Sequence, residues 1–277
     1  MPEIFYPRDN TLRKYIRYMY RVSSDDPGFQ RQLVLFPNAG SAIAIYEDVD
    51  FCSDSYQEFS SFEKNGNKNI ILHLNRKDPV TIREKGKQKR IVIVFGPLGI
   101  NHFMDVPPGA LLKSNNPTLI PLIPVDRNFI KFCDLIPINR PLSESGPLIE
   151  ELLLERINEF SNAFLESCVS ALMTSDSSSK IEEIALKKKV SEKTLNRQFH
   201  KYIGLSPVEF RKIIQFRHAI SLKLENNSSK HSDIALESNY YDLPYMTKVF
   251  KKMTGISASD FFHKISSCFD KQYVYIG

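Results

Sequence analysis

The sequence predicts an α+β protein with two domains, a β-rich N-terminal domain and an all-α C-terminal domain. Three observations support this fold class. Short runs of β-forming residues alternate with turn residues before residue 125, the apolar period becomes helical near Pro147, and the last third of the chain repeats itself. The 277 residues suffice for one large or two modest domains, each with its own core.

The N-terminal domain, residues 1–146, is expected to be a small antiparallel sandwich or barrel. Apolar residues at helical spacing predict one helix, over residues 12–20, packed across the sheet. Turn-forming Asn, Gly, Asp and Pro residues separate the runs that follow. These runs are rich in Val, Ile and Phe and occupy residues 32–37, 41–46, 70–74, 80–83 and 90–95.

Residues 147–179 are expected to form a helical bridge and a loop. Apolar residues recur at helical spacing from Leu148 to Leu172, which predicts two consecutive helices broken around Ser161. The serine-rich residues 174–179 predict a loop. The leucine-rich stripe of residues 148–173 leaves two interpretations open, a dimer surface or packing between the domains.

Residues 180–265 contain an internal repeat with a period of about 50 residues. The tripeptide Ile184-Ala185-Leu186 recurs as Ile234-Ala235-Leu236. Five further residues recur 51 positions later, so the turn of the second copy holds one extra residue. The pairs are Leu195 with Met246, Phe199 with Phe250, Gly204 with Gly255, Ser206 with Ser257 and Phe210 with Phe261. Each copy reads as a short helix, a tight turn and a second helix.

Helix-end signals support this division. Ser191 is a good N-cap for the second helix of the first copy, and Gly204 can supply its left-handed end. Ser206, Pro207 and Glu209 then form the pattern of a capping box with proline at the first helical position. That pattern predicts a connecting helix that runs to about residue 224.

The second copy has equivalent signals. Asn239 suits a turn position with positive φ, Asp242 can cap the helix 243–253, and Gly255 can end it. A connecting helix of about 18 residues is about 27 Å long, close to the roughly 34 Å of one DNA turn. Two helix-turn-helix units at this distance predict one chain that reads two successive major grooves of double-stranded DNA. The alternative is a helical bundle with an accidental repeat.

Charge is concentrated in the same region. Residues 176–277 contain 17 Lys and Arg against 11 Asp and Glu, whereas residues 1–175 contain 20 against 21. The net charge of +5 therefore comes from the C-terminal third. This asymmetry favours a polyanionic partner, although a lysine-rich solvated surface would also produce it.

At residues 181–264 the chain resembles the DNA-binding domain of the AraC/XylS family of transcription regulators. The resemblance rests on IEEIALKKKVSEKTLNRQFHKYIGLSPVEF and SDIALESNYYDLPYMTKVFKKMTGISASDFF, and it covers about a third of the chain. The N-terminal part, with IVIVFGPLGINHFMDVP, looks like the cupin-like sensor domains of such regulators. The resemblance implies sequence-specific DNA binding, a homodimer, a small-molecule effector and contact with RNA polymerase, more often as an activator than as a repressor.

The family pattern also implies roles for residues of the first recognition helix. Lys193, Asn196 and Arg197 would face base edges, where Arg can pair with guanine and Asn with adenine. Lys201 and Lys212 are better placed for phosphates, which set register without reading sequence. For each of them the alternative is a solvated surface side chain.

The second recognition helix departs from the family pattern. Leu243 and Pro244 stand where polar residues are usual, and Leu243 could touch a thymine methyl group. We expect this half to grip the DNA backbone and to add less sequence information. Its candidate contacts are Tyr241, Tyr245, Lys248, Lys251 and Lys252.

A cupin-like β-barrel enzyme, or a small-molecule-binding protein with a helical appendage, is the alternative function. His73 and His102 are isolated, so we expect no catalytic residues, no metal and no cofactor. The four cysteines are expected to be buried free thiols in a reducing compartment, because they lie far apart: Cys52, Cys133, Cys168 and Cys268.

The sequence also indicates where the protein works. Its opening residues contain neither a basic nor an apolar leader region, and no apolar run approaches the roughly 18 residues of a membrane span. We expect a cytoplasmic protein that makes no membrane contact. A dimer is expected through the N-terminal domain or the helices of residues 148–173. The pattern nominates no effector-binding residue, and it assigns no role to the tail, residues 266–277.

Overall fold

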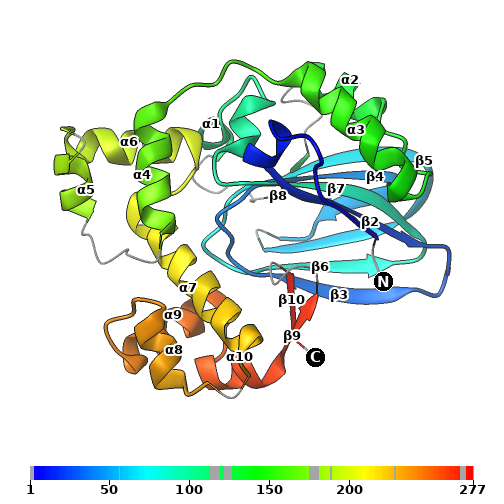
Figure 1. The fold of residues 1–277 in the computed structure, drawn as a ribbon. Helices are drawn as coiled ribbons and strands as arrows, with labels where there is room; N and C mark the ends of the chain where they lie inside the picture. Colours follow the sequence, from blue (N-terminus) through cyan, green and yellow to red (C-terminus); the bar gives the residue numbers. More distant parts are fainter. Residues whose placement is uncertain are drawn as a thin grey trace.

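A single curved β-sheet and a chain of helices make up the protein in the computed structural model (Figure 1). The structure describes residues 3–55, 57–112, 119–121, 127–174, 181–187, 189–227, 229–268 and 273–276. The sheet order is β1-β2-β7-β4-β5-β6-β3, with β8 paired to β5. The strands are β1 (Glu3–Phe5), β2 (Ile16–Ser24), β3 (Gln30–Leu35), β4 (Ala42–Ser53), β5 (Glu58–His73), β6 (Val80–Lys85), β7 (Gln88–Phe95) and β8 (Leu119–Pro121). All pairs are antiparallel except β5 with β6.

Both faces of the sheet are buried, which explains why its central strands are almost continuously apolar. One face carries Ile43, Ile45 and Ile93 and packs against α2 (Arg127–Asp134) and α3 (Leu142–Arg156). The other face carries Ala44 and Val92 and forms the inside of a half-barrel. The predicted β-rich N-terminal domain is confirmed, as one curled sheet.

The prediction of a helix over residues 12–20 is wrong. Only η1 (Leu12–Lys14) is helical there, as a single 3-10 turn, and β2 begins at Ile16. Strand β2 is buried on both faces, because Met19 packs into the helix-covered core and Tyr18 into the half-barrel. A strand buried on both faces has no polar alternation, so its apolar spacing imitated a helix.

The helical bridge belongs to both cores. The expected boundary at residues 146 and 147 falls inside α3, which contains Pro147 and packs on the sheet. The break around Ser161 is present, and α4 (Ala163–Met173) follows it. Helix α4 buries Leu165 and Leu172 in the core of the C-terminal helices. Most apolar residues of the leucine-rich stripe therefore pack against other parts of the same chain.

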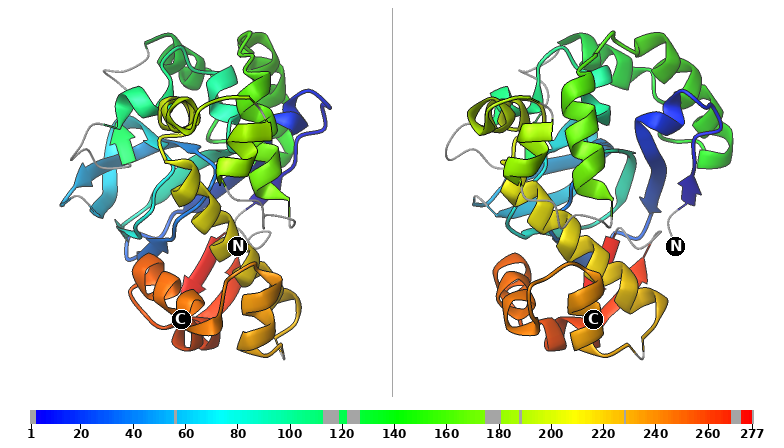
Figure 2. Two further views of the ribbon diagram at one scale, coloured as in Figure 1. Left: turned by 90° about the vertical axis from the view of Figure 1, so that its left-hand side faces the viewer. Right: turned by 60° about the vertical axis from the view of Figure 1, so that its left-hand side comes forward.

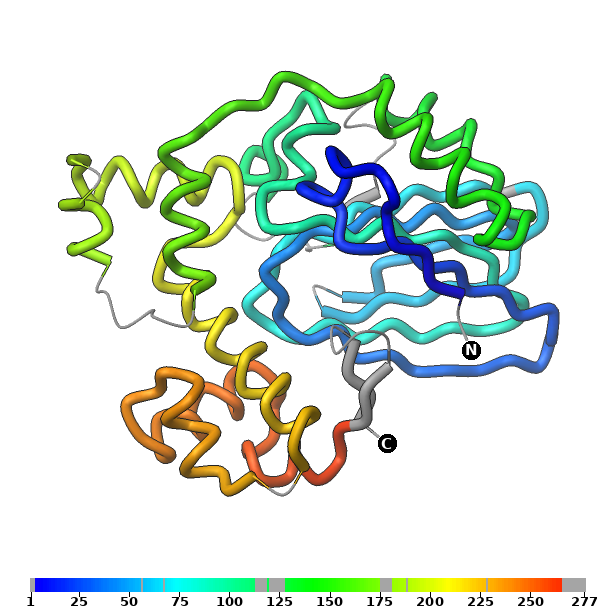
Figure 3. Tube along the Cα trace, in the orientation of Figure 1, coloured from blue at the N-terminus to red at the C-terminus, as the bar shows by residue number. Residues whose placement is uncertain are grey.

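The C-terminal domain is all-α, as predicted. Its helices are α5 (Ile181–Lys187), α6 (Glu192–Tyr202), α7 (Pro207–Glu225), α8 (His231–Glu237), α9 (Leu243–Thr254) and α10 (Ala258–Lys264). Figure 3 follows the chain from the sheet over α2 and α3 to α4, and then along α7 to the last helices. The tail forms a hairpin of β9 (Ile265–Cys268) and β10 (Tyr273–Ile276), and β10 contacts β3.

Shorter elements join the domains. The 3-10 helix η2 (Gly99–His102) and α1 (Pro108–Leu111) follow β7 and lie between the sheet and α6 (Figure 1). None of the helices in the described parts of the chain combines the length and the hydropathy needed to cross a bilayer. Helix α1 thus brings the N-terminal domain into contact with α6 of the first helix-turn-helix unit.

Candidate nucleic-acid interface

The first helix-turn-helix unit is defined by its capped helix ends. The Ser191 side chain accepts a hydrogen bond from the Thr194 amide at 3.2 Å and caps α6. Gly204 follows with φ +81°, a backbone conformation that an L side chain rarely adopts. Ser206 and Glu209 form the predicted capping box at the start of α7. These local signals fix the angle at which α6 leaves the turn.

The second unit, α8 and α9, repeats this construction. Asn239 has φ +59° in the turn, and the Asp242 side chain accepts a hydrogen bond from the Tyr245 amide at 2.7 Å. Gly255 ends α9 with φ +83°. The helix ends predicted from the sequence are therefore present in both copies, and α9 runs one residue further than expected, to Thr254.

Equivalent apolar residues form the cores of the two units. Leu195 and Phe199 of α6 are buried, as are Met246 and Phe250 of α9. The Phe216 ring of α7 lies 4.9 Å from the Phe250 ring, centroid to centroid. Because these residues face inward, the opposite faces of α6 and α9 are left for a partner.

Helix α7 joins the two units as a single rod of 19 residues, about 28 Å at 1.5 Å per residue. The buried Gln215 side chain donates a hydrogen bond to the Asn239 carbonyl at 2.6 Å, which ties the rod to the turn of the second unit. The two units lie at the two ends of α7, the first beside the sheet and the second below it in Figure 1, and Figure 2 shows α7 between them from two further sides.

All five residues predicted for the first half of the interface reach the surface. Lys193, Arg197 and Lys201 are exposed, and Asn196 and Lys212 are half-buried. The Asn196 amide donates to the Glu192 carbonyl at 3.0 Å, and the Lys201 ammonium lies 4.7 Å from the Tyr202 ring centre. Asn196 can therefore contact a base only if its side-chain amide breaks this hydrogen bond to the Glu192 carbonyl.

The residues predicted for the second half are exposed as well: Tyr241, Tyr245, Lys248, Lys251 and Lys252. Tyr241 is 93% exposed, which is unusual for an aromatic residue. Leu243 and Tyr245 are each 37% exposed and begin α9. The second unit therefore presents an apolar tip beside a lysine-rich flank.

A hollow of about 700 Å³ lies between the two units. Its lining includes Arg211 and Lys212 of α7 together with Tyr240, Tyr241 and Tyr245 of the second unit. The structure thus brings together Lys212, Tyr241 and Tyr245, which are distant in the sequence. The lining also contains Glu182 of α5 and apolar side chains, among them Ile181, Val208 and Leu236.

The N-terminal domain holds the C-terminal end of α6. The Asn75 amide donates to the Ile203 carbonyl at 2.8 Å, and the Asn101 amide donates to the Tyr202 carbonyl at 3.0 Å. A Cβ built on Gly109 of α1 would lie 1.8 Å from the His200 carbonyl oxygen. These contacts leave exposed Lys193, near the N-terminal end of α6, and Arg197, in the middle of the helix.

A second contact joins the N-terminal domain to α7. The Arg217 guanidinium donates to the carbonyls of Pro37 and Phe36, at 2.6 and 2.9 Å. The Phe36 ring also packs edge to face on Phe261 of α10, with ring centres 5.1 Å apart. Sequence reasoning missed these residues, because no local pattern marks a side chain that bonds to a distant carbonyl.

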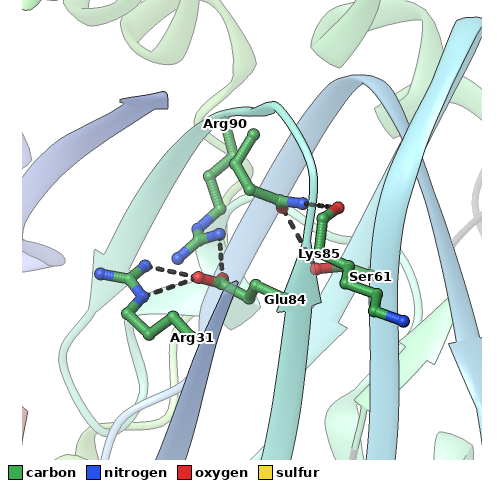
Figure 4. A network of polar contacts seen from close by, with 6 residues as sticks. Arg31, Ser61, Glu84, Lys85 and Arg90 are labelled. Carbon is green, nitrogen blue, oxygen red and sulfur yellow. Dashed lines mark hydrogen bonds and ion pairs between the residues drawn. The ribbon is translucent and has the colours of Figure 1, made fainter. Parts of the chain in front are cut away.

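The half-barrel interior contains a buried ion network (Figure 4). Glu84 pairs with Arg90 and, at 2.6 Å, with Arg31. Burial lowers the pKa of Arg90, but interactions with Glu84, Tyr46 and Tyr20 together outweigh burial, so the pKa is raised above its ordinary value. Burial, reinforced by Arg76 and Arg90, lowers the pKa of His73 to about 3, so this imidazole is neutral at physiological pH.

The described residues contain no cluster of metal-ligating side chains. No group of three or more His, Cys, Asp or Glu side chains among them could hold a metal ion. Cys133 and Cys168 are buried and outside disulfides, as expected, but Cys52 is exposed near the end of β4, where the strand leaves the core. The buried His102 stacks on Tyr15, with ring centres 3.7 Å apart, which is a packing role.

Comparison with known proteins supports the C-terminal assignment. Residues 184–264 match a family model described as a helix-turn-helix domain. No curated protein matches the chain. Among solved structures, ToxT from Vibrio cholerae is similar at 15% identity and a TM-score of 0.45, over 88% of this chain and 96% of that chain.

Two further solved structures match smaller parts of the chain. The C-terminal domain of AraT, a response regulator from Geobacillus stearothermophilus, matches at 21% identity, over 39% of this chain and 91% of that domain, with a TM-score of 0.36. The xylose-binding transcription activator xylR matches at 14% identity, over 43% of this chain and 37% of its own, with a TM-score of 0.33.

Two capped helix pairs with exposed cationic faces and a matching family model define a DNA-binding helix-turn-helix domain. The matched residues are those that resemble the AraC/XylS family. The C-terminal part of the chain, residues 184–264, is thus a helix-turn-helix domain of the AraC/XylS type.

Proposed function

We propose that α6 and α9 enter two successive major grooves on one face of a DNA duplex. The observation that carries this proposal is the pair of equivalent helix-turn-helix units on one rod of 19 residues. In this arrangement Arg197 and Asn196 read base edges in the first groove. Lys201, Lys212, Lys248, Lys251 and Lys252 contact phosphates, and Tyr241 and Tyr245 lie against the strand between the grooves.

Binding-site selection from a random duplex library tests this proposal. We expect the full chain to enrich a site with two half-sites about one DNA turn apart. Its affinity should fall steeply with salt, with a slope of about −0.9 in log K against log salt for each neutralised phosphate. A flat salt response, or no enriched sequence, would contradict the proposal.

We further propose that the N-terminal domain regulates the DNA-binding domain. The contacts of Asn75 and Asn101 with α6, and of Arg217 with the 36–37 loop, provide a direct mechanical link. A small-molecule effector in the N-terminal domain would act through these contacts, with no catalytic step and no cofactor. Asn75→Ala with Asn101→Ala should alter DNA affinity while leaving the selected sequence unchanged, in a gel-shift assay against the selected duplex.

The remaining partners follow from the resemblance. We propose a homodimer, with exposed Leu148 and Leu154 of α3 as candidate contacts, acting in the cytoplasm as an activator that contacts RNA polymerase. Sedimentation of the full chain tests the dimer. We expect two copies in the wild type and a shift towards one in Leu148→Glu. Transcription in vitro from a promoter carrying the selected site tests activation.

A further inference from the structure

We infer that the second helix-turn-helix unit recognises its half-site through thymine methyl groups, with Leu243 as the specificity-determining residue. The inference rests on the proposed function, because it requires α9 to enter a major groove. It assigns to this unit a chemical class of target, A·T-rich DNA read by apolar contact, in place of hydrogen-bonded base edges.

The first argument is the position of the apolar side chains. Leu243 and Tyr245 occupy the first turn of α9, and recognition helices contact base edges with their N-terminal residues. Both are partly exposed although the core behind them is complete, because Met246 and Phe250 fill it. Leu243 is thus 37% exposed at the end of the helix that recognition helices turn towards base edges.

The second argument is the shortage of hydrogen-bonding groups at this end. Pro244 has no amide hydrogen, and the Tyr245 amide already donates to Asp242. The thymine methyl group is the one apolar feature that a base pair presents in the major groove. Leu243 is therefore matched chemically to thymine and to no other unmodified base.

The third argument is charge complementarity around the apolar tip. Lys248, Lys251 and Lys252 follow on the same helix and are exposed, and Lys212 lines the neighbouring hollow with Tyr241 and Tyr245. A protein partner that bound these apolar side chains would not require the lysines that follow them on the helix, whereas a DNA backbone does. Duplex DNA is therefore the occupant that the surface fits.

The test replaces thymine with deoxyuridine, which removes only the methyl group. Selection with the wild type gives the site, and selection with Arg197→Ala identifies the half-site of α6 as the one that loses sequence preference. We expect the other half-site to be rich in A·T pairs. Deoxyuridine there should weaken binding about fourfold for each contacted methyl, the effect of exposing one methylene-sized group. Deoxyuridine in the α6 half-site should have little effect.

The variant Leu243→Ala completes a double-mutant cycle with the replacement of thymine by deoxyuridine. In this variant the difference between thymine and deoxyuridine duplexes should largely disappear, because the contacting side chain is gone. Tyr241→Ala serves as the matched surface control and should retain the difference. If the second half-site enriches no thymine, or deoxyuridine has no effect on the wild type, the inference is overturned while DNA binding stands. If no sequence is enriched at all, both the proposed function and the inference fail.

Discussion

The two helix-turn-helix units share one construction but present different surfaces. Their cores, caps and glycine ends agree at the 51-residue offset, with Phe199 and Phe250 equally buried. Their outer faces differ in the first helical turn, where α6 carries Glu192, Lys193 and Thr194 and α9 carries Leu243, Pro244 and Tyr245, whereas Arg197 of α6 matches Lys248 of α9. The positions that folding requires are thus repeated, whereas the first turns of the two recognition helices have diverged.

The units also differ in their attachment to the rest of the molecule. The first is held at the end of α6 by Asn75, Asn101 and Gly109 of the N-terminal domain. The second meets that domain mainly through Phe36 against α10. A structural change in the N-terminal domain should therefore affect the first unit, with its polar recognition helix, more directly than the second unit.

The largest predicted effect tests the shared core. Phe199→Ala and Phe250→Ala should each lower the free energy of unfolding by about 3–5 kcal/mol, because each removes a fully buried ring from an equivalent site. Urea denaturation of the full chain measures both. A cost below 1 kcal/mol at one site only would show that the two cores are not equivalent.

The second prediction tests the divergent surfaces. Arg197→Ala should cost about 1–3 kcal/mol of specific affinity and relax base preference in one half-site. Lys248→Ala should weaken all duplexes alike and make the salt slope shallower by about 0.9. Binding-site selection and salt titration on both variants check this ranking. Equal loss of base preference in the two variants would remove the distinction between the units.

The third prediction tests the unequal attachment. Gly109→Ala should destabilise the first unit by about 1–2 kcal/mol, since the new Cβ must displace the backbone of α6. Hydrogen exchange should speed up at residues 199–204 and stay unchanged at residues 250–255. Gly28→Ala is the control, because its Cβ would meet only the exposed Asp26 side chain.

The smallest predicted effect concerns the N-terminal caps of α7 and α10. Burial raises the pKa of Glu209, but bonds to Ser206 and the nearby Lys77 outweigh it, so the pKa lies below its ordinary value. The ionised form is thus favoured in the folded state, and its stabilisation is present above about pH 4.5 and lost as the pH falls further. Glu209→Gln should cost about 0.3–1 kcal/mol at pH 7 and less below pH 4.

The matched variant in the second unit is Asp260→Asn. Asp260 lies beside Ser257 at the equivalent cap, without a lysine from the N-terminal domain among its described ion pairs. Denaturation at pH 7 and pH 4 compares the two variants. A larger loss for Asp260→Asn than for Glu209→Gln would contradict the contribution of Lys77.

Much of the C-terminal domain could be predicted from the sequence because its determinants are local. Ser191, Asp242 and the glycines act on their own helix ends, and the repeat shows which apolar residues face inward. The N-terminal domain was harder, since β2 is buried on both faces and its pattern fits a helix equally well. The contacts of Asn75 and Arg217 were invisible, because their partners are carbonyls more than 120 residues away.

Helix α7 has a consequence for the spacing of target sites. It contains no glycine, and its one proline is at the first position, so the rod has no built-in hinge. Inserting about five base pairs between the half-sites would rotate the second groove to the far side of the duplex. The chain could then engage only one half at a time, so the length of this helix sets the helical phase that a promoter must keep.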